Sequence, residues 1–483
     1  MSVKTNKKIS SYESIINAIG VFSFLHFFKL LSGIITTKFA AIYLGPFGVG
    51  ILGLIKNSLS LISSVTNFGF SETGLREVAK TNIASNKTET NITIQLVTSL
   101  SSYLGVLGGL LTIVLCMPLS FWIFETYDKF YWFVLLSLFF LFETKTIAYS
   151  SVLKGLSKLK LITVSNILSS IISTTVIIAC YFKFGIEGII PALVLSSFTT
   201  FVVHYLTFKK LNFTIDRIKF KKLLKESKPL IELGLVLSFN VILGLFFYLL
   251  IRLYLTHFAI SDKHLGFYQV SITILTSYVG MVFNAMSSDF FPRLTSVINN
   301  DSLSRKLVNK QIEITLLVVI PLIVLFYLLG DVIIKLLYSV EFLEVGLILK
   351  FGLLSIFFKA IVWPLDYIVL AKGNKKQYFK QQLLGDVLNL VLTILLYELF
   401  GLIGIGVSLS LNFILSGSYL VNYVIKTYNY SFSKQSLKVV IYSAIIVFAS
   451  CLISTYTNSV LFNIIILLSS LGYSYKELKI RMK

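Results

Sequence analysis

Long apolar runs separated by short polar segments fill the chain from residue 14 to residue 474. A helix needs about 20 mainly apolar residues to cross roughly 30 Å of hydrocarbon, and the runs reach that scale. They predict fourteen membrane-spanning helices, with twelve as the alternative because the last run is short. The predicted spans are 14–44, 47–70, 92–118, 130–150, 160–180, 185–207, 230–256, 265–288, 312–336, 345–371, 381–399, 402–425, 437–455 and 459–474.

The composition supports an all-α membrane protein. Of the 483 residues, 56% are hydrophobic and only 13% are charged, and the mean hydropathy is +0.85. The net charge of +21 comes from short basic clusters between apolar runs, the pattern of the positive-inside rule, so no nucleic-acid partner is expected. The three cysteines lie in separate apolar runs without metal-binding spacing, so neither a metal nor a cofactor is expected.

The distribution of Lys and Arg predicts the orientation. With the N-terminus inside, 32 of the 43 basic residues fall in inner segments, and only Lys129, Lys183, Lys263 and Lys335 fall in outer loops. We therefore expect a multi-pass protein with both termini in the cytoplasm. The largest basic cluster, at 209–229, is expected to be a cytoplasmic linker that contacts anionic membrane lipids.

Four pairs of short motifs recur at an offset of 216 to 218 residues. One pair is Phe184-Gly185-x-x-Gly188 and Phe400-Gly401-x-x-Gly404. A repeat of six spans predicts two pseudo-symmetric six-helix lobes around a central cavity. The expected domains are an N-terminal lobe at 1–208, the basic linker at 209–229, a C-terminal lobe at 230–425, and two additional helices with a basic tail at 426–483.

Seven cations lie inside predicted spans, where an unpaired charge is costly. Four of them, Lys38, Lys145, Arg252 and Lys350, are near span ends, from which long side chains can reach the interface. The deeper ones are Lys29, Lys56 and Lys359. Two interpretations stay open for these three: ion pairs with buried acids, or a cationic cavity that accepts an anionic group.

Other polar residues at membrane depth have similar alternatives. His26 lies one turn before Lys29 and is either a bonded core histidine or part of the same site. Asn67 lies in a polar run, 63–69, that either lines a wet path or makes helix–helix hydrogen bonds. Three buried acids, Glu143, Asp366 and Asp386, are candidates for ion coupling.

Two opposite-charge pairs recur at inner span ends. They are Glu72 with Arg76 and Asp289 with Arg293, each four residues apart. Such pairs commonly brace a helix, but their duplication also suggests a gate between the lobes.

The chain lacks the motifs GxxxxGK[ST], HExxH and GxSxG, and its predicted outer loops are short. These features favour a transporter over an enzyme, and no catalytic residue is predicted.

Three motifs carry a family resemblance. They are Tyr43-Leu-Gly-Pro-Phe-Gly-Val-Gly50, Asn67-Phe-Gly69 and Phe291-Pro-Arg-Leu294. Over about residues 15–425 the chain resembles the polysaccharide flippases of the multidrug/oligosaccharidyl-lipid/polysaccharide (MOP) exporter superfamily, of the O-antigen translocase (Wzx) type. The two additional C-terminal helices depart from the twelve-span members and resemble the extra pair of peptidoglycan lipid flippases.

The resemblance implies that the chain moves undecaprenyl-diphosphate-linked oligosaccharide, an O-antigen unit of lipopolysaccharide or a similar polysaccharide unit, by alternating access. The location implied is the bacterial inner membrane, and the partners implied are a polysaccharide polymerase and a chain-length regulator. Lys29, Lys56, Lys359 and Arg252 would then escort the diphosphate. The rival functions are a cation-coupled multidrug exporter of the same superfamily and a membrane glycan polymerase.

Overall fold

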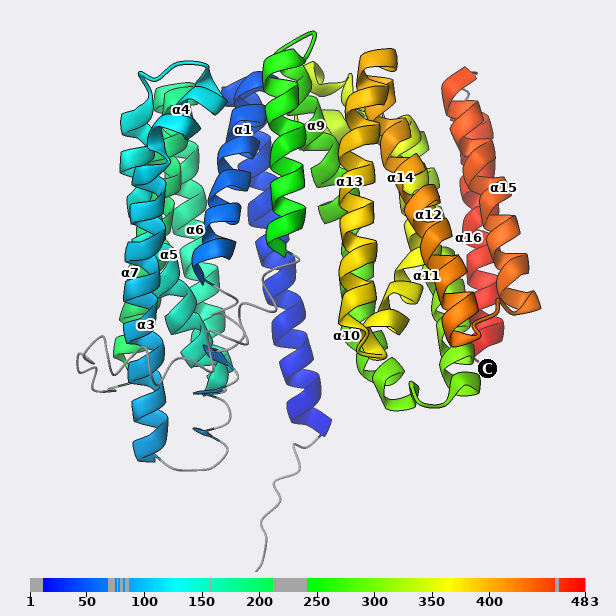
Figure 1. Ribbon diagram of the computed structural model, residues 1–483, viewed down its shortest axis with the longest axis horizontal. Coiled ribbons are helices and arrows are strands. Elements are labelled where there is room, and N and C mark those ends of the chain that lie inside the picture. Colours follow the sequence, from blue (N-terminus) through cyan, green and yellow to red (C-terminus); the bar gives the residue numbers. More distant parts are fainter. Residues whose placement is uncertain are drawn as a thin grey trace, which may run out of the picture. The chain divides into compact units, whose positions relative to one another are not determined.

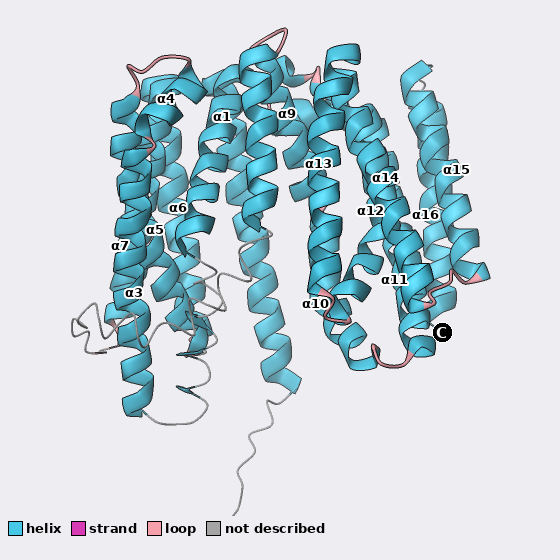
Figure 2. Ribbon diagram, in the orientation of Figure 1, coloured by secondary structure: helices cyan, strands magenta, loops and turns pink. Residues whose placement is uncertain are grey.

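Helices form almost all of the computed structural model, which describes residues 12–67, 74–75, 77–78, 81–82, 87–156, 158–211, 213, 241–456 and 460–482. Figure 2 shows helices joined by short loops, and there is no strand within these ranges. The predicted all-α fold is therefore confirmed. The linker at 209–229 lies outside the described residues from 214 onward.

The chain divides into two compact units. Unit 1 comprises Met1–Leu44 and Ser58–Ile242, and unit 2 comprises Gly45–Asn57 and Leu243–Lys483. The helix α1 (Tyr12–Asn67) contributes to both units (Figure 1). The other helices of unit 1 are α3 (Lys87–Val114), α4 (Cys116–Phe124), α5 (Phe130–Gly155), α6 (Leu159–Phe184), η1 (Gly185–Gly188) and α7 (Ile189–Lys209).

Unit 2 begins, after its α1 segment, with the helix Val241–Phe258. It continues with α9 (Lys263–Thr273), the π-helical turn η2 (Ile274–Val279), α10 (Met281–Val297), α11 (Asp301–Leu337), η3 (Val340–Phe342), α12 (Val345–Ala371), α13 (Lys375–Phe400), α14 (Leu402–Tyr428), α15 (Lys434–Tyr456) and α16 (Val460–Met482).

Within the described ranges, eleven helical segments are long and apolar enough to cross a membrane. Lys160–Lys209 contains two of the predicted spans, and Leu31–Asn67 overlaps two others. The eleven segments therefore overlap every predicted span except the last one. That span corresponds to α16, whose C-terminal half carries several charged residues.

The first two spans meet at Gly45, where α1 leaves helical geometry with φ 63° and ψ −175°. Pro46 follows, at a position where a helix start tolerates its missing N–H. A Cβ on Gly50 would lie 2.8 Å from the backbone nitrogen of Gly266 in α9, and a Cβ on Gly266 would lie 2.6 Å from the carbonyl carbon of Pro46. The glycines thus let α1 and α9 pack backbone against backbone in unit 2.

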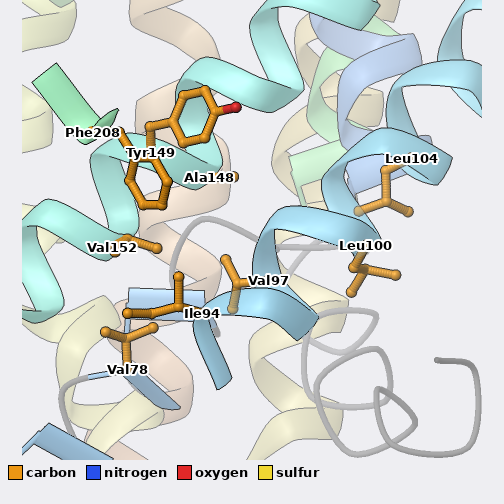
Figure 3. Close-up of a cluster of buried hydrophobic side chains, with 9 residues drawn as sticks. All are labelled: Val78, Ile94, Val97, Leu100, Leu104, Ala148, Tyr149, Val152 and Phe208. Atoms are coloured by element: carbon orange, nitrogen blue, oxygen red, sulfur yellow. The ribbon is translucent and has the colours of Figure 1, made fainter. Parts of the chain in front are cut away.

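A cluster of buried apolar side chains holds unit 1 together (Figure 3). Tyr149 of α5 stacks on Phe208 at the end of α7, with ring centroids 4.7 Å apart. Phe208 therefore anchors α7 just before the basic linker starts at Lys209. The full cluster is Val78, Ile94, Val97, Leu100, Leu104, Ala148, Tyr149, Val152 and Phe208.

The turns of one repeated motif have the same geometry in both units. Gly185 has φ 54° and ψ −130°, and Gly401 has φ 57° and ψ −135°. Each turn has a second glycine three residues later: a Cβ on Gly188 would collide with the carbonyl of Cys180, and one on Gly404 with that of Leu396. The sequence repeat is thus matched by a repeated helix–turn–helix structure.

Candidate functional site

The most unusual buried charge of unit 2 is Arg252, on the helix Val241–Phe258. Arg252 as a whole is only 7% exposed to solvent. Nη2 donates a hydrogen bond to Oε1 of Gln269 in α9 at 2.7 Å. Nε and Nη1 have no hydrogen-bond partner among the described residues. A buried guanidinium with unused donors is suited to an anionic ligand, since it binds phosphate and carboxylate groups with two N–H groups at once.

Helix α1 contributes the second wall of this region. Gly53 makes room for Gln269, because a Cβ there would lie 2.6 Å from Cδ of that side chain. Lys56 is three residues further along α1, which places it on the helix face that meets Gln269; it is exposed. Asn57 Nδ2 donates to the carbonyl oxygen of Leu245 at 3.1 Å and ties α1 to the helix of Arg252. We call Gly53, Lys56, Arg252 and Gln269 the cationic cluster.

An acidic residue, Asp386, lies near the face of the helix Val241–Phe258 that carries Arg252. The Oδ2 atom of Asp386, in α13, lies 3.8 Å from the position of a Cβ on Gly244. Asp386 also interacts electrostatically with Tyr248. Gly244, Tyr248 and Arg252 are spaced four residues apart and share one face. Asp386, a predicted coupling acid, therefore lies near Gly244, two helical turns from Arg252, a predicted substrate-binding residue, along one helix of unit 2.

Lys359, in α12, is surrounded differently. Its Nζ lies 4.9 Å from the ring centroid of Phe283 in α10, a cation–π distance. It also interacts electrostatically with Asp366, whose Oδ1 accepts a hydrogen bond of 2.9 Å from Gln381 in α13. Lys359 and Asp366 form no ion pair within 4.0 Å, so both interpretations of Lys359 stay predictions.

Among the described side chains, two predicted site residues lie in unit 1. Glu143, in α5, has a buried Oε2 without a hydrogen-bond partner among the described residues. The nearby Lys145 instead donates to the backbone oxygen of Thr98 at 2.8 Å. Asn67 donates to Ser63 Oγ at 2.7 Å, within α1, and its Oδ1 has no partner in the described part of the chain.

One residue of the predicted gate pairs is described: Arg293 is an exposed residue of α10. Glu72 and Arg76 lie outside the described residues, as do the side chains of His26, Lys29 and Asp289. Across the described ranges, no group of three or more His, Cys, Asp or Glu residues is arranged to hold a metal ion.

Sequence reasoning missed Gln269 and Gln381, the amides that bond Arg252 and Asp366. A signal for Gln381 does exist in α13, where the buried polar residues Gln377, Gln381, Asn389 and Thr393 are spaced by four or eight. Gln269 has no comparable signal, because its position opposite Gly53 depends on how α1 and α9 pack.

Comparisons with known proteins bear on this arrangement. A family model described as "Polysaccharide biosynthesis protein" matches residues 15–298, more than half of the chain. The chain belongs to this polysaccharide biosynthesis family. A second model, described as "Lipid II flippase MurJ", matches residues 245–474. A search of curated proteins found no match.

Solved structures show which fold this family member has. A lipid II flippase MurJ in an inward closed conformation is similar at 17% identity, with a TM-score of 0.64, over 97% of this chain and 99% of that one. An inward-facing multidrug resistance MATE transporter of the MOP superfamily is similar at 13% identity, with a TM-score of 0.60, over 83% of this chain and 96% of that one. A MOP superfamily transporter from Pyrococcus furiosus has 13% identity and a TM-score of 0.57 over 86% and 96%. The chain thus has the fold of MOP superfamily transporters.

Proposed function

We propose that the protein is a flippase that moves an undecaprenyl-diphosphate-linked oligosaccharide, such as an O-antigen unit, from the cytoplasmic to the periplasmic leaflet of the bacterial inner membrane by alternating access. Membership of the polysaccharide biosynthesis family supports a saccharide cargo. The similarity to the model of a lipid II flippase over residues 245–474 supports a lipid-linked one.

The observation that carries the proposal is the state of Arg252. A buried cation is costly in a membrane protein unless a partner offsets it. One neutral amide, Gln269, accepts from this guanidinium, and two further nitrogens, Nε and Nη1, remain without partners among the described residues. A diphosphate supplies the missing negative charge and acceptors, and Lys56 on the adjoining face of α1 adds a second cation.

The remaining predicted residues have secondary roles in this scheme. Glu143, Asp366 and Asp386 are the candidates for coupling transport to an ion gradient. Arg293 belongs to the proposed inner gate. Both termini lie in the cytoplasm, as the distribution of Lys and Arg predicts.

The test is transport of a fluorescent undecaprenyl-diphosphate glycan in proteoliposomes that contain the full-length protein. Arg252→Gln should lower the initial rate by at least about tenfold, because a charged hydrogen bond contributes roughly 1.5–3 kcal/mol. Arg252→Lys should recover part of the rate, since it restores charge without the planar fork. Lys183→Gln, a change at an exposed cation in the last turn of α6, is the matched control.

Three results would contradict the proposal. Wild-type rates for both Arg252→Gln and Lys56→Ala, with purified protein of normal stability, would remove the cationic cluster from substrate handling. Saturable binding of lipophilic cations, with no binding of the diphosphate lipid, would support the multidrug exporter instead. Glycan elongation by the purified protein would support a polymerase.

A further inference from the structure

A separate cavity lies in unit 2 between α11, α12, α15 and α16, and its volume is about 430 Å³. Its polar walls are Asp331, Lys350, Ser454 and Asn463. Each of these residues lies within about two turns of a helix end: α11 ends at Leu337, α12 begins at Val345, α15 ends at Tyr456 and α16 begins at Val460. The cavity is therefore at one boundary of the membrane, at the outer leaflet under the predicted orientation.

The cavity contains one anion and one cation. The Oδ1 atom of Asp331 lies 3.5 Å from the position of a Cβ on Gly346, so the carboxylate rests against the first turn of α12. Lys350 is four residues beyond Gly346, on the same face of α12. Within the described ranges, neither charged group has an ion-pair partner within 4.0 Å. Two opposite charges thus line one small space without neutralising each other at contact distance.

Hydrogen bonds from two neighbouring helices hold the turn of α12 that carries Lys350. The backbone oxygen of Lys350 accepts hydrogen bonds from the hydroxyl of Tyr327 at 2.7 Å and from the thiol of Cys451 at 3.4 Å. These bonds come from α11 and α15, which are also walls of the cavity. The lysine is therefore held at a defined height between these helices.

A buried amide adds an unused acceptor. Asn463 is 4% exposed, and its Oδ1 has no hydrogen-bond partner in the described part of the chain. A buried oxygen left without a donor costs about 1–3 kcal/mol. An N–H donor inside the cavity would remove this cost.

These groups define the chemistry of a ligand. A phosphate would be neutralised by Lys350, and a primary ammonium has N–H groups for both Asp331 and Asn463. A quaternary ammonium has no N–H to donate, and a purely anionic headgroup would place its charge beside Asp331. Two apolar residues, Leu336 and Leu461, each lie two positions along the chain from a residue that lines the cavity. They are 71% and 74% exposed and offer a surface for acyl chains.

We propose that this cavity binds the headgroup of a zwitterionic phospholipid with a primary amine, with the phosphate on Lys350 and the ammonium on Asp331 and Asn463. The lipid would seat the α15–α16 pair against α11 and α12. This site is distinct from the cationic cluster, and the proposal does not depend on which substrate is transported.

Native mass spectrometry of the purified full-length protein tests the assignment. The protein is offered equal amounts of phosphatidylethanolamine, phosphatidylcholine and phosphatidylglycerol with identical acyl chains. We expect phosphatidylethanolamine to be retained about tenfold more than either competitor, a difference of about 1.4 kcal/mol. Asp331→Asn and Asn463→Leu should remove the preference over phosphatidylcholine, and Lys350→Gln should lower retention of all three lipids. Asp128→Asn and Lys263→Gln change exposed charges elsewhere and should have no effect.

Equal retention of the three lipids by the wild-type protein would overturn the proposal, and this comparison stands even where a variant fails to fold. An unchanged preference in folded Asp331→Asn and Lys350→Gln proteins would also overturn it. Soluble O-phosphoethanolamine is the second probe. If it binds the delipidated protein as tightly as the phospholipid does, the site recognises a free solute and the lipid assignment is wrong.

Discussion

The substitution Gly53→Ala tests the cationic cluster without altering any charge. The new Cβ would lie 2.6 Å from Cδ and 2.7 Å from Cγ of Gln269, well inside van der Waals contact. These atoms belong to a flexible side chain, so Gln269 can rotate away while α1 and α9 stay in place. The rotation would remove the Oε1 atom that accepts from Arg252 at 2.7 Å.

The expected effect on transport follows from that lost bond. A hydrogen bond to a charged group contributes about 1.5–3 kcal/mol, which corresponds to a factor of roughly ten to one hundred and fifty in an equilibrium. Replacing glycine with alanine in a helix returns about 0.5–1 kcal/mol of folding stability. We therefore expect a small change in melting temperature and a much larger fall in the transport rate, because Arg252 loses its orientation.

The same helix supplies the control. Gly33 has open space at the Cβ position, so Gly33→Ala brings the same gain in helix propensity without a collision. Initial rates in proteoliposomes and melting temperatures of the purified proteins are compared for Gly33→Ala, Gly53→Ala, Gln269→Ala and the double variant at 53 and 269. If the bond to Arg252 is the only route, the double variant should be no slower than Gln269→Ala alone. Transport by Gly53→Ala at the rate of Gly33→Ala would refute the reasoning.

Two further predictions concern other parts of the chain. Glu143→Gln should abolish the acceleration of transport by an imposed proton gradient while leaving the amount of protein in the membrane normal. The control Glu344→Gln, at an exposed position, should keep the acceleration. An unchanged response to the gradient in Glu143→Gln would exclude this acid from coupling. Ser436→Ala removes a 2.6 Å hydrogen bond from α15 to the buried carboxylate of Glu313 in α11, and it should lower the free energy of unfolding by about 1–3 kcal/mol in a thermal unfolding assay. The control Ser418→Ala loses only a bond within its own helix and should lower it less.

The helical fold could be predicted because each span carries its own signal. The run 130–150 became α5, Phe130–Gly155, and 381–399 became α13, Lys375–Phe400. The helices extend beyond the apolar runs, since backbone hydrogen bonds continue into polar water-facing turns that hydropathy does not detect. The short helix α4, Cys116–Phe124, was missed because it continues the apolar run of α3 after an interruption at Leu115.

The candidate site was only partly predictable. Cations in apolar runs are conspicuous, so Arg252 and Lys359 could be chosen from the sequence alone. The partner of Arg252 could not, since Gln269 becomes its neighbour only through packing between helices. Asp366, by contrast, was already among the buried acids considered for the deep cations, and it lies on the same helix as Lys359. The glycine at position 53 looked like any small residue of a membrane helix, and its role appears only when the side chain that it accommodates is known.

The sequence repeat shows which features the two halves share, namely their turns, and which differ, namely side chains along the helices. The paired turns at Gly185 and Gly401 agree to within a few degrees in φ and ψ, so the hairpins α6–α7 and α13–α14 are built from one local rule. Side chains along the hairpins differ: at the offset of 216 that aligns these turns, Asp386 of α13 corresponds to Ser170 of α6. A duplicated scaffold constrains the turns, because only glycine adopts their backbone angles without strain. The positions outside the turns are free to diverge, and one of them holds Asp386, the acid near the helix that carries Arg252. Asymmetry between the copies is therefore where a coupling site for this transporter fold should be sought.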